Sequence, residues 1–201
     1  MSPRKREQLE AIRESSRNTI LQAALRLFAE RGYHATTIEA IAREAGIAKG
    51  LVYNYFASKQ DLLRQLVLLG FREFEELLPE LLRTVDPVER LHVLFELSGK
   101  LIREKTEFYR LYMMVLLQVN RDKELSKIIQ EYSRTLYAET EEILRELGVA
   151  DVETEARLLA ALLDGIGLHF IVLSGEYPLQ EVLQAAERHY LTGSGKKAIA
   201  S

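Results

Sequence analysis

Cysteine and tryptophan are absent from this chain of 201 residues, and proline occurs only four times. Without cysteine the protein has no disulfide bond, no thiolate metal ligand and no cysteine nucleophile, as is typical of proteins in the reducing cytoplasm. Apolar residues make up 47% and charged residues 28% of the sequence. These fractions predict a folded cytoplasmic protein with a sizeable core rather than a disordered one.

Long apolar segments are also lacking. The run LYMMVLL at 111–117 is far shorter than the roughly 20 residues that span a membrane as a helix. The amino terminus, MSPRKREQLEAIRESS, is basic but has no apolar segment behind its charges, unlike a secretory signal. The sequence therefore predicts a soluble protein with no membrane partner.

Motifs that carry catalysis are missing too. The sequence contains no P-loop, no H-E-x-x-H zinc motif and no G-x-S-x-G nucleophile motif. The spacing E-x-x-H occurs only at Glu89–His92, whereas a di-iron helical bundle needs two such pairs and two further glutamates. We therefore expect no catalytic residues, no metal site and no cofactor, and we assign His92 a structural or exposed position.

Charge is distributed unevenly along the chain. Residues 1–65 hold eleven Lys or Arg against seven Asp or Glu, although the whole chain carries a net charge of -3. A basic amino-terminal part and an acidic remainder indicate that the first part contacts a polyanion, although chance scatter of a few charges explains the difference equally well.

Apolar residues recur with helical spacing throughout, and no alternating strand pattern occurs. The prediction is an all-α protein with an amino-terminal three-helix helix-turn-helix domain and a carboxy-terminal helical bundle. We expect a DNA-binding domain at 1–64 with a basic arm at 1–15, a ligand-binding and dimerisation domain at 65–192, and a disordered tail at 193–201. The expected helices cover about 16–31, 36–45, 48–55, 58 to Pro79, 87–102, 106–118, 122–147, 152–174 and 178–191. The Arg/Glu-rich stretch before residue 16 either extends the first helix or stays loose.

Two short helices near residue 46 predict a helix-turn-helix. Thr36 and Glu39 have the T-x-x-E spacing of a capping box at the start of the first helix, and Gly46 ends it. The second helix must begin near Ala48, so that the turn is tight. Ser58 and Asp61 have the capping-box spacing for the next, longer helix.

The second short helix has a composition that favours DNA contact over packing. Glycine in a helix interior costs about 1 kcal/mol, but Gly50 allows close approach of the backbone to DNA. Lys49 suits a phosphate or a guanine edge, and Tyr53 and Asn54 follow one turn later on the same side. Lys59 suits a phosphate at the start of the next helix. Core positions are predicted for Val52 and Phe56, and Tyr55 suits either role.

The segment of residues 19–63 reads TILQAALRLFAERGYHATTIEAIAREAGIAKGLVYNYFASKQDLL. It resembles the DNA-binding domain of the tetracycline-repressor (TetR) family of bacterial transcription regulators. The matching features are the alanine-rich first helix, the F-x-x-x-G-Y turn, T-T-I, A-G-I and K-G-x-x-Y-x-Y-F-x-S-K-x-x-L.

The resemblance implies which residues contact DNA. Base or backbone contacts are expected from Lys49, Gly50, Leu51, Tyr53 and Asn54, and backbone contacts also from Thr36, Thr37 and Lys59. Two positions depart from the family pattern. Ala48 stands where serine is frequent and removes an N-cap oxygen, and Leu51 stands where threonine or serine is frequent and offers a thymine methyl contact at most. The operator sequence is therefore not transferable from relatives.

Residues 152–174 are apolar on nearly all sides and therefore need apolar partners on two sides. The resemblance implies that the last two helices form the interface of a homodimer, which would read the two halves of an inverted-repeat operator in double-stranded DNA. The residues expected at this interface, each with an intramolecular core position as its alternative, are Leu159, Leu163, Ile166, Phe170, Leu183, Ala186 and Tyr190.

The carboxy-terminal part is rich in aromatic and methionine residues, which suit an apolar ligand pocket. Their simpler role is core packing, and for His169 a core position is the simpler role as well. If they line a pocket, the expected effector is hydrophobic, either aromatic or an acyl chain, and neither a sugar nor a metal. The candidate ligand-binding residues are Phe74, Phe95, Phe108, Tyr112, Met113, Tyr132, Leu136, His169 and Phe170.

These features predict a ligand-responsive DNA-binding transcription regulator, most simply a repressor that a hydrophobic small molecule releases from its operator. Four alternatives stay open: an activator, a regulator controlled by a protein partner, an architectural DNA-binding protein without effector, and a ligand-binding or enzymatic bundle in which the helix-turn-helix is incidental.

Overall fold

The computed structural model describes residues 3–76, 83–117, 122–173 and 175–192, and only the backbone of residues 3–5, 7, 73 and 74. All elements in these ranges are α-helices, so the all-α prediction is confirmed. The amino-terminal helices are α1 (Pro3–Arg31), α2 (Ile38–Glu44), α3 (Lys49–Val52) and α4 (Lys59–Glu75). The carboxy-terminal helices are α6 (Pro87–Glu104), α7 (Thr106–Leu116), α8 (Lys123–Glu146), α9 (Val152–Leu173) and α10 (Leu179–Thr192).

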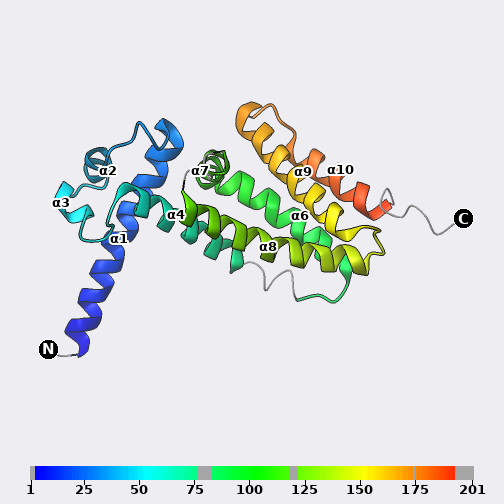
Figure 1. Cartoon of the computed structure of the whole chain (residues 1–201), viewed down its shortest axis with the longest axis horizontal. Coiled ribbons are helices and arrows are strands. Elements are labelled where there is room, and N and C mark those ends of the chain that lie inside the picture. Colours follow the sequence, from blue (N-terminus) through cyan, green and yellow to red (C-terminus); the bar gives the residue numbers. More distant parts are fainter. Residues whose placement is uncertain (1–2, 77–82, 118–121, 174, 193–201) are drawn as a thin grey trace, which may run out of the picture.

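Two sequence predictions fall outside these ranges. The helix end expected at Pro79 and the tail expected at 193–201 are not among the described residues. Helix α1 begins at Pro3, so the Arg/Glu-rich stretch before residue 16 extends the first helix. The amino-terminal half of α1 projects away from the rest of the molecule (Figure 1).

The start of α2 corrects the predicted capping box. The N-cap is Thr37, whose side-chain oxygen accepts a hydrogen bond from the backbone N–H of Ala40 at 3.1 Å. Thr36 is buried instead, and its hydroxyl donates to the carbonyl oxygens of Gly32 and Leu27 at 2.8 and 3.1 Å. The spacing to Glu39 misled the prediction because adjacent threonines both suit an N-cap, and only the fold decides which of them is buried.

Helix α3 is shorter than predicted, since it ends at Val52 and is followed by a turn over 53–55. Its N-cap residue Ala48 makes no side-chain hydrogen bond, as alanine dictates. The predicted core positions of Val52 and Phe56 are confirmed, because both side chains are buried. Tyr55 is partly buried against the same core.

The amino-terminal core continues into the carboxy-terminal part. Leu111 and Val115 of α7 and Leu125 and Ile129 of α8 belong to the same buried cluster as the apolar residues of α1, α2 and α4. A change in the position of α7 or α8 therefore acts directly on the packing of the helix-turn-helix.

A second core joins α6, α7, α8, α9 and α10. Helices α6, α8, α9 and α10 run alongside one another in Figure 1, whereas α7 is seen end-on near the middle of the molecule. Helix α6 starts with Pro87 after the N-cap Asp86, whose side chain accepts from the Val88 N–H at 3.0 Å. Proline suits this position because its ring fixes the helical φ and its missing N–H would have no partner there.

Candidate DNA-binding surface and ligand cavity

The predicted DNA contacts of α3 and its following turn lie on the surface. Lys49, Gly50 and Asn54 are exposed, Leu51 is partly exposed, and Tyr53 keeps 51% of its surface exposed. Lys49 Nζ lies 3.8 Å from Glu39 Oε2, but both side chains are more than half exposed, so this ion pair contributes little. These side chains are free to contact a partner because Val52 and Phe56 hold the segment from beneath.

Gly50 has no role in packing within the protein. A Cβ atom added there would meet no other atom within 4 Å. Glycine also weakens a helix, so packing within the described residues does not explain its presence at this exposed position.

Two of the predicted DNA-contact residues hold the domain together. Lys59 Nζ donates to the carbonyl oxygens of Tyr33 and Thr36, both at 2.8 Å, and more weakly to that of His34 at 3.4 Å. It also lies 4.4 Å from the centre of the Tyr33 ring. Burial lowers the pKa of Lys59. Lys59 and the buried Thr36 thus fix the loop between α1 and α2, whereas Thr37 is exposed.

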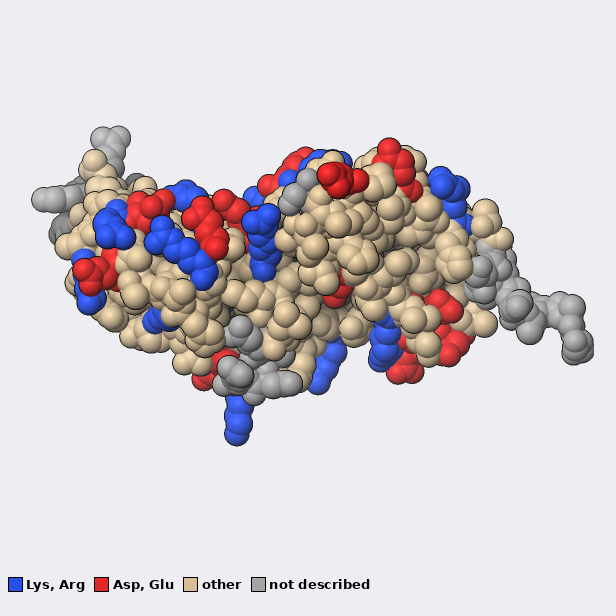
Figure 2. Space-filling view, turned by 90° about the horizontal axis from the view of Figure 1, so that it is seen from above, with Lys and Arg blue, Asp and Glu red and all other residues tan. Residues whose placement is uncertain are grey.

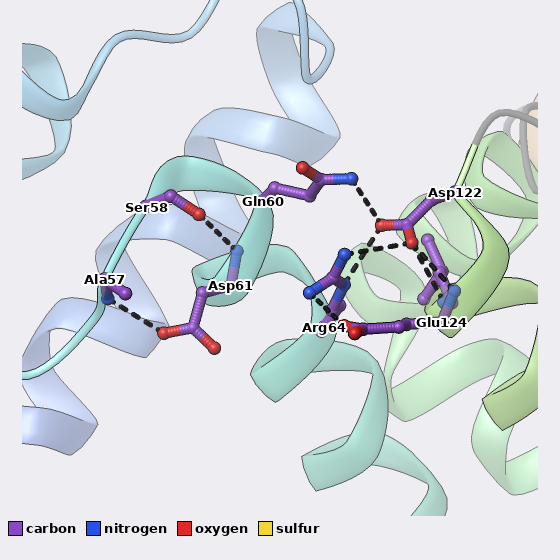
Figure 3. A network of polar contacts seen from close by, with 8 residues as sticks. Ala57, Ser58, Gln60, Asp61, Arg64, Asp122 and Glu124 are labelled. Atoms are coloured by element: carbon purple, nitrogen blue, oxygen red, sulfur yellow. Dashed lines mark hydrogen bonds and ion pairs between the residues drawn. The ribbon is translucent and has the colours of Figure 1, made fainter.

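A polar network joins α4 to the start of α8 (Figure 3). Arg64 donates from Nε to Asp122 Oδ2 at 3.1 Å and from Nη2 to Oδ1 at 3.0 Å, and it also pairs with Glu124. Gln60 donates to Asp122 Oδ2 at 2.7 Å. Burial alone would raise the pKa of Asp122, but the hydrogen bonds from Arg64, from the Leu125 N–H and from Gln60 hold it at about 2.

The same helix, α4, is capped as its sequence predicts. The Asp61 N–H donates to the Ser58 hydroxyl at 3.0 Å, and the Asp61 carboxylate accepts from the N–H of Ala57 at 2.9 Å rather than from that of Ser58 (Figure 3). Helix α4 therefore carries Lys59 at its start and Arg64 in its second turn, and it reaches further into the carboxy-terminal part.

A cavity lies among α4, α6, α7, α8 and α9. Its walls are largely aromatic and aliphatic, which supports the predicted ligand role of Phe108, Tyr112, Tyr132 and Leu136. The Phe108 ring lies so close to Gly70 of α4 that a Cβ atom there would overlap it. The lining residues are Gly70, Phe71, Leu94, Ser98, Leu101, Ile102, Phe108, Tyr109, Tyr112, Tyr132, Ser133, Leu136, Tyr137, Thr140, Leu159, Ala160, Leu163 and Asp164.

Sequence reasoning missed the most polar residue of this cavity, Asp164 of α9. The Tyr109 hydroxyl lies 3.4 Å from Asp164 Oδ1 and equally far from the Leu163 carbonyl oxygen. Burial raises the pKa of Asp164 to about 6, and the bond from Tyr109 lowers it by a smaller amount. A single carboxylate within the apolar stretch LLAALLDGIGLHF was the available sequence signal.

The other predicted ligand residues lie outside the cavity lining. Phe95 is buried in the second core, and Met113 and Phe170 pack against that core, because the helices turn these side chains away from the cavity. His169 is exposed on α9, with its ring 5.9 Å from that of Tyr177, so neither the core position nor a cavity position holds for it. The side chain of Phe74 is not among the described residues.

The predicted dimer residues face the core of their own subunit instead. Leu159, Ile166, Leu183, Ala186 and Tyr190 are buried in the second core, and Leu163 and Phe170 pack against it. Because α9 is apolar on nearly all sides, the sequence does not show which of its faces packs inside the subunit. In the folded chain the residues predicted for the dimer interface take the core positions that were their alternative. The large apolar side chains that α9 leaves exposed are Leu158, Leu162, Leu168, Val172 and Leu173.

Helix α9 is also long and apolar enough to cross a membrane, with a mean hydropathy of 1.8 over its most apolar window, of which only 22% is buried. Length and composition are the sole basis for that possibility. A helix that packs on its own core with one face and on a protein partner with the other has the same composition.

The amino-terminal half of the molecule carries side chains of both charges on its surface (Figure 2). On the face shown in Figure 2, Lys and Arg side chains lie among Asp and Glu side chains over the amino-terminal half, whereas broad uncharged areas cover the carboxy-terminal half. On this face the cations therefore stand among carboxylates rather than forming one continuous basic patch. In the described residues no group of His, Cys, Asp or Glu has the arrangement of a metal site.

Two family models match this sequence. The model described as bacterial regulatory proteins of the tetR family matches residues 20–66, and the model described as the C-terminal part of BetI-type transcriptional repressors matches residues 87–192. The chain belongs to the TetR family. The resemblance found in residues 19–63 is thus confirmed, and this TetR-family protein is a ligand-responsive transcriptional repressor and not an enzyme.

Individual relatives agree with this assignment. The HTH-type transcriptional regulator BetI of Agrobacterium fabrum is 27% identical over 176 residues, which cover 87% of this chain and 85% of that protein. A transcriptional regulator of Saccharomonospora viridis in complex with choline superposes with a TM-score of 0.80 and 24% identity, covering 90% of this chain and 97% of that one.

FadR of Bacillus subtilis in complex with stearoyl-CoA has a TM-score of 0.72 and 22% identity, with 87% and 97% of the two chains covered. Because both structural identities are below 25%, these likenesses establish the shared fold and not a shared ligand.

Proposed function

We propose that this repressor binds an inverted-repeat operator as a homodimer and leaves it when a largely apolar small molecule fills the cavity beside α4. The observation that carries the DNA part of the proposal is the set of Lys49, Gly50, Tyr53 and Asn54, which are exposed together on and after α3. The observation that carries the effector part is an aromatic cavity that shares α4 with the helix-turn-helix.

Direct DNA contacts are proposed only for residues that are exposed or partly exposed. Lys49 and Asn54 suit base edges or phosphates, Gly50 allows the backbone to approach, and Tyr53 offers a hydroxyl to phosphate or a ring to a thymine methyl. Leu51 suits a thymine methyl, and Thr37 suits a phosphate. Lys59 and Thr36 act in this proposal by positioning the loop before α2, because their polar atoms are already bound to backbone carbonyls.

The dimer is proposed to form through the exposed apolar face of α9. That face carries exposed large apolar side chains at helical spacing, namely Leu158, Leu162, Leu168 and Val172. Leaving such a patch in contact with water in a single subunit is unfavourable. Gly165 lies on the same face of α9, and a Cβ atom added there would meet no other atom within 4 Å. A partner helix can therefore approach closely at this position. A second copy is the fitting occupant because a twofold dimer presents two α3 segments to two half-sites.

The coupling between cavity and DNA surface is proposed to run through α4 and α7. Helix α4 contributes Gly70 and Phe71 to the cavity, Arg64 to the network with Asp122, and Lys59 to the loop before α2. Helix α7 contributes Phe108, Tyr109 and Tyr112 to the cavity and Leu111 and Val115 to the amino-terminal core.

A ligand that wedges these two helices apart changes the position of α3 in each subunit. It does so only to the extent that it binds the shifted state more tightly, and a preference of about 1.4 kcal/mol corresponds to a tenfold change in population.

The first test of the DNA part is fluorescence anisotropy with labelled DNA taken from immediately upstream of the gene for this protein, with scrambled DNA of equal length as the control. The proposal expects tight binding to the upstream fragment alone, weakening as salt rises. Lys49→Ala should weaken binding and reduce the salt slope by about two, since each subunit of the proposed dimer loses about one phosphate contact. Equal, weak binding to both fragments calls for a selection from random DNA, and failure to enrich an inverted repeat there would refute the proposal.

Lys127→Ala is a matched control for Lys49→Ala. Lys127 lies on α8, is even more exposed to solvent than Lys49, and has a similar weak ion pair, with its Nζ 3.8 Å from Glu131 Oε1. The Lys127→Ala substitution removes one positive charge at a site away from α3. It should therefore leave both the affinity for DNA and the salt slope unchanged. Equal effects of the two substitutions would show that binding follows net charge rather than contact by α3.

A further inference from the structure

Phe108 of α7 lies between two hollow spaces in the structure. On one side is the cavity among α4, α6, α7, α8 and α9, and on the other is a groove bounded by α1, α4 and the junction of α6 with α7. Of the described residues that line these spaces, Gly70 and Phe108 belong to both. The ring of Phe108 and the backbone of Gly70 therefore form the wall between the groove and the cavity.

The groove has the character of an entrance. Its volume of about 370 Å³ has room for a small organic molecule beside the closed wall. Exposed polar side chains stand at its edge and apolar side chains lie deeper, so a largely apolar molecule can leave water in steps. The exposed residues include Gln22, Glu104 and Glu107, and the buried or partly buried ones are Leu25, Leu66 and Leu69.

Gly70 lets a side chain from another helix complete this wall. A Cβ atom at Gly70 would overlap the Phe108 ring, so the ring occupies the space that a side chain of α4 would otherwise fill. Glycine inside a helix costs about 1 kcal/mol relative to alanine, and Gly70 lies well inside α4. The closure between groove and cavity thus depends on a ring that can rotate and not on a fixed part of α4.

Phe108 is placed where its ring can rotate. It lies in the first turn of α7, after Lys105 interrupts the helical path with φ -115° and ψ 37°, and α7 leaves α6 at a large angle (Figure 1). A first-turn side chain has no preceding turn of its own helix against it, so more rotamers are open to it. The next residue, Tyr109, is 5% exposed and its hydroxyl is within 3.4 Å of two oxygen atoms of α9, whereas Phe108 is partly exposed and apolar.

From this arrangement we infer that Phe108 is the gate through which the effector passes between the groove and the cavity, and that its ring closes on Gly70. The inference rests on the proposed use of the cavity as the effector site. Rotation of the ring away from Gly70 joins the two spaces without movement of a helix. Its return closes the cavity over the bound molecule and excludes water, as lids do in other binding sites.

Access to the cavity can be measured directly because the chain has no cysteine. Thr140→Cys places a single thiol in the cavity, at a residue that is 4% exposed. The full-length variant is treated with benzyl methanethiosulfonate, a neutral aromatic reagent, and mass spectrometry of the intact protein gives the rate of labelling. In this background Phe108→Ala should speed labelling at least about tenfold, which corresponds to a barrier lower by about 1.4 kcal/mol.

Two further substitutions in the same background separate a gate from a loss of packing. Leu136→Ala also removes apolar volume from the cavity wall, but Leu136 does not line the groove. It should therefore speed labelling much less than Phe108→Ala, although both destabilise the fold. Gly70→Ala adds a methyl group that displaces the Phe108 ring, so it should speed labelling severalfold even though it adds atoms to the wall.

A third pair of substitutions tests the groove as the route. Gln22→Trp places a large side chain at an exposed position of α1 that lines the groove, and it should slow labelling severalfold. Gln130→Trp is the matched control, because Gln130 is an exposed glutamine of α8 that lines neither the groove nor the cavity. This control should label at the rate of the Thr140→Cys parent.

Contrary results are distinct from failure of the proposed function. A Phe108→Ala protein that labels no faster than Leu136→Ala would overturn the inference, as would a Gly70→Ala protein that labels more slowly than the parent. Equal rates for Gln22→Trp and Gln130→Trp would show that molecules enter elsewhere. The cavity is still the effector site in each of these cases if a compound that fills it releases operator DNA. If the rates change as expected but no compound in the cavity alters DNA binding, the gate stands and the proposed function fails.

Discussion

The guanidinium of Arg64 holds both carboxylate oxygens of Asp122, at 3.0 and 3.1 Å. The same carboxylate caps α8 by accepting from the N–H groups of Glu124 and Leu125, both at 3.1 Å. One side chain therefore completes the first turn of a helix in the ligand-binding part and fastens it to the helix that leads from the DNA-binding part. The two roles of Asp122 can be separated by substitution.

Asp122→Asn should keep the cap and lose the ion pair, whereas Asp122→Ala should lose both. We expect a loss in the free energy of unfolding of about 1–3 kcal/mol for the asparagine variant, and about 1 kcal/mol more for the alanine variant. Urea denaturation followed by circular dichroism measures both. Equal losses for the two variants would mean that the cap contributes nothing beyond the ion pair.

Acid should remove the contribution of Asp122. Because its pKa in the folded protein, about 2, is below the ordinary value of 3.8, the stabilisation is complete above about pH 4 and is lost as pH falls towards 2. The difference in unfolding free energy between wild type and Asp122→Asn should therefore be constant from about pH 5 to 7 and shrink below about pH 4. A difference that persists at about pH 2 would contradict this assignment.

Gly50→Ala should raise stability and weaken operator binding. Alanine favours a helix by up to about 1 kcal/mol over glycine, and nothing in the protein obstructs the new methyl group. The methyl group would instead occupy the space proposed for DNA. Thermal unfolding and anisotropy measure the two effects on one preparation. Unchanged operator affinity would show that the backbone at Gly50 does not approach DNA.

Lys59→Ala and Tyr53→Ala should differ in stability although both weaken DNA binding. Loss of the bonds from Lys59 to the Tyr33 and Thr36 carbonyl oxygens should cost about 1–3 kcal/mol. Tyr53 is half exposed, so its removal should change stability by less than about 0.5 kcal/mol. Denaturation curves decide, and a Lys59→Ala variant as stable as the wild type would return Lys59 to the role of a direct phosphate contact.

Leu162→Glu in α9 should convert the dimer to a monomer and lower operator affinity. Leu162 keeps 39% of its surface exposed in the single chain, so the substitution leaves the subunit core intact while placing a charge in the proposed interface. Sedimentation equilibrium measures the assembly state. Val85→Glu is the control, because Val85 is 94% exposed in the segment before α6 and the substitution should have no effect. A Leu162→Glu protein that stays dimeric would place the interface elsewhere.

Asp164→Asn should stabilise the protein in the absence of ligand. Because burial raises the pKa of Asp164 from 3.8 to about 6, the folded state holds this proton more tightly than the unfolded chain does, and stability falls as pH rises between these values. The variant avoids that loss. We expect a gain on the order of 1–2 kcal/mol at about pH 7.5, shrinking to nearly zero below about pH 4, in paired thermal denaturation. A variant less stable than the wild type at about pH 7.5 would show that the charge has an internal partner.

The helix-turn-helix was predictable because local signals and tertiary structure agree there. Gly46, the Ser58 cap and the buried Val52 and Phe56 each depend on neighbours within a few residues. The internal hydrogen bonds of Thr36 and Lys59 were not predictable in this way, because their partners, the carbonyl oxygens of Leu27 in α1 and of Tyr33 in the following loop, are distant in the sequence. Exposure of a polar side chain is a property of the folded domain, and residue type alone does not report it.

The ligand cavity was predictable only in part. An aromatic-rich segment indicated Tyr112 and Phe108, but the same composition also placed Phe95 and Phe170 in the candidate set, although both pack outside the cavity. Asp164 escaped notice because a lone acid in an apolar helix is as easily an exposed residue. Its meaning depends on Tyr109, which the chain brings to it from another helix.

The sequence by itself determined that the chain is helical, that its first part is a TetR-type helix-turn-helix and that α9 needs apolar contacts on two sides, since period and capping residues are local properties. Only the tertiary structure decided which side of α9 each leucine takes. Leu159 lies in the core and Leu158 on the surface, because successive residues of a helix point about 100° apart and the packing of α9 on its neighbouring helices decides which of these directions is buried. The same packing turned Asp164 inward to the tyrosines.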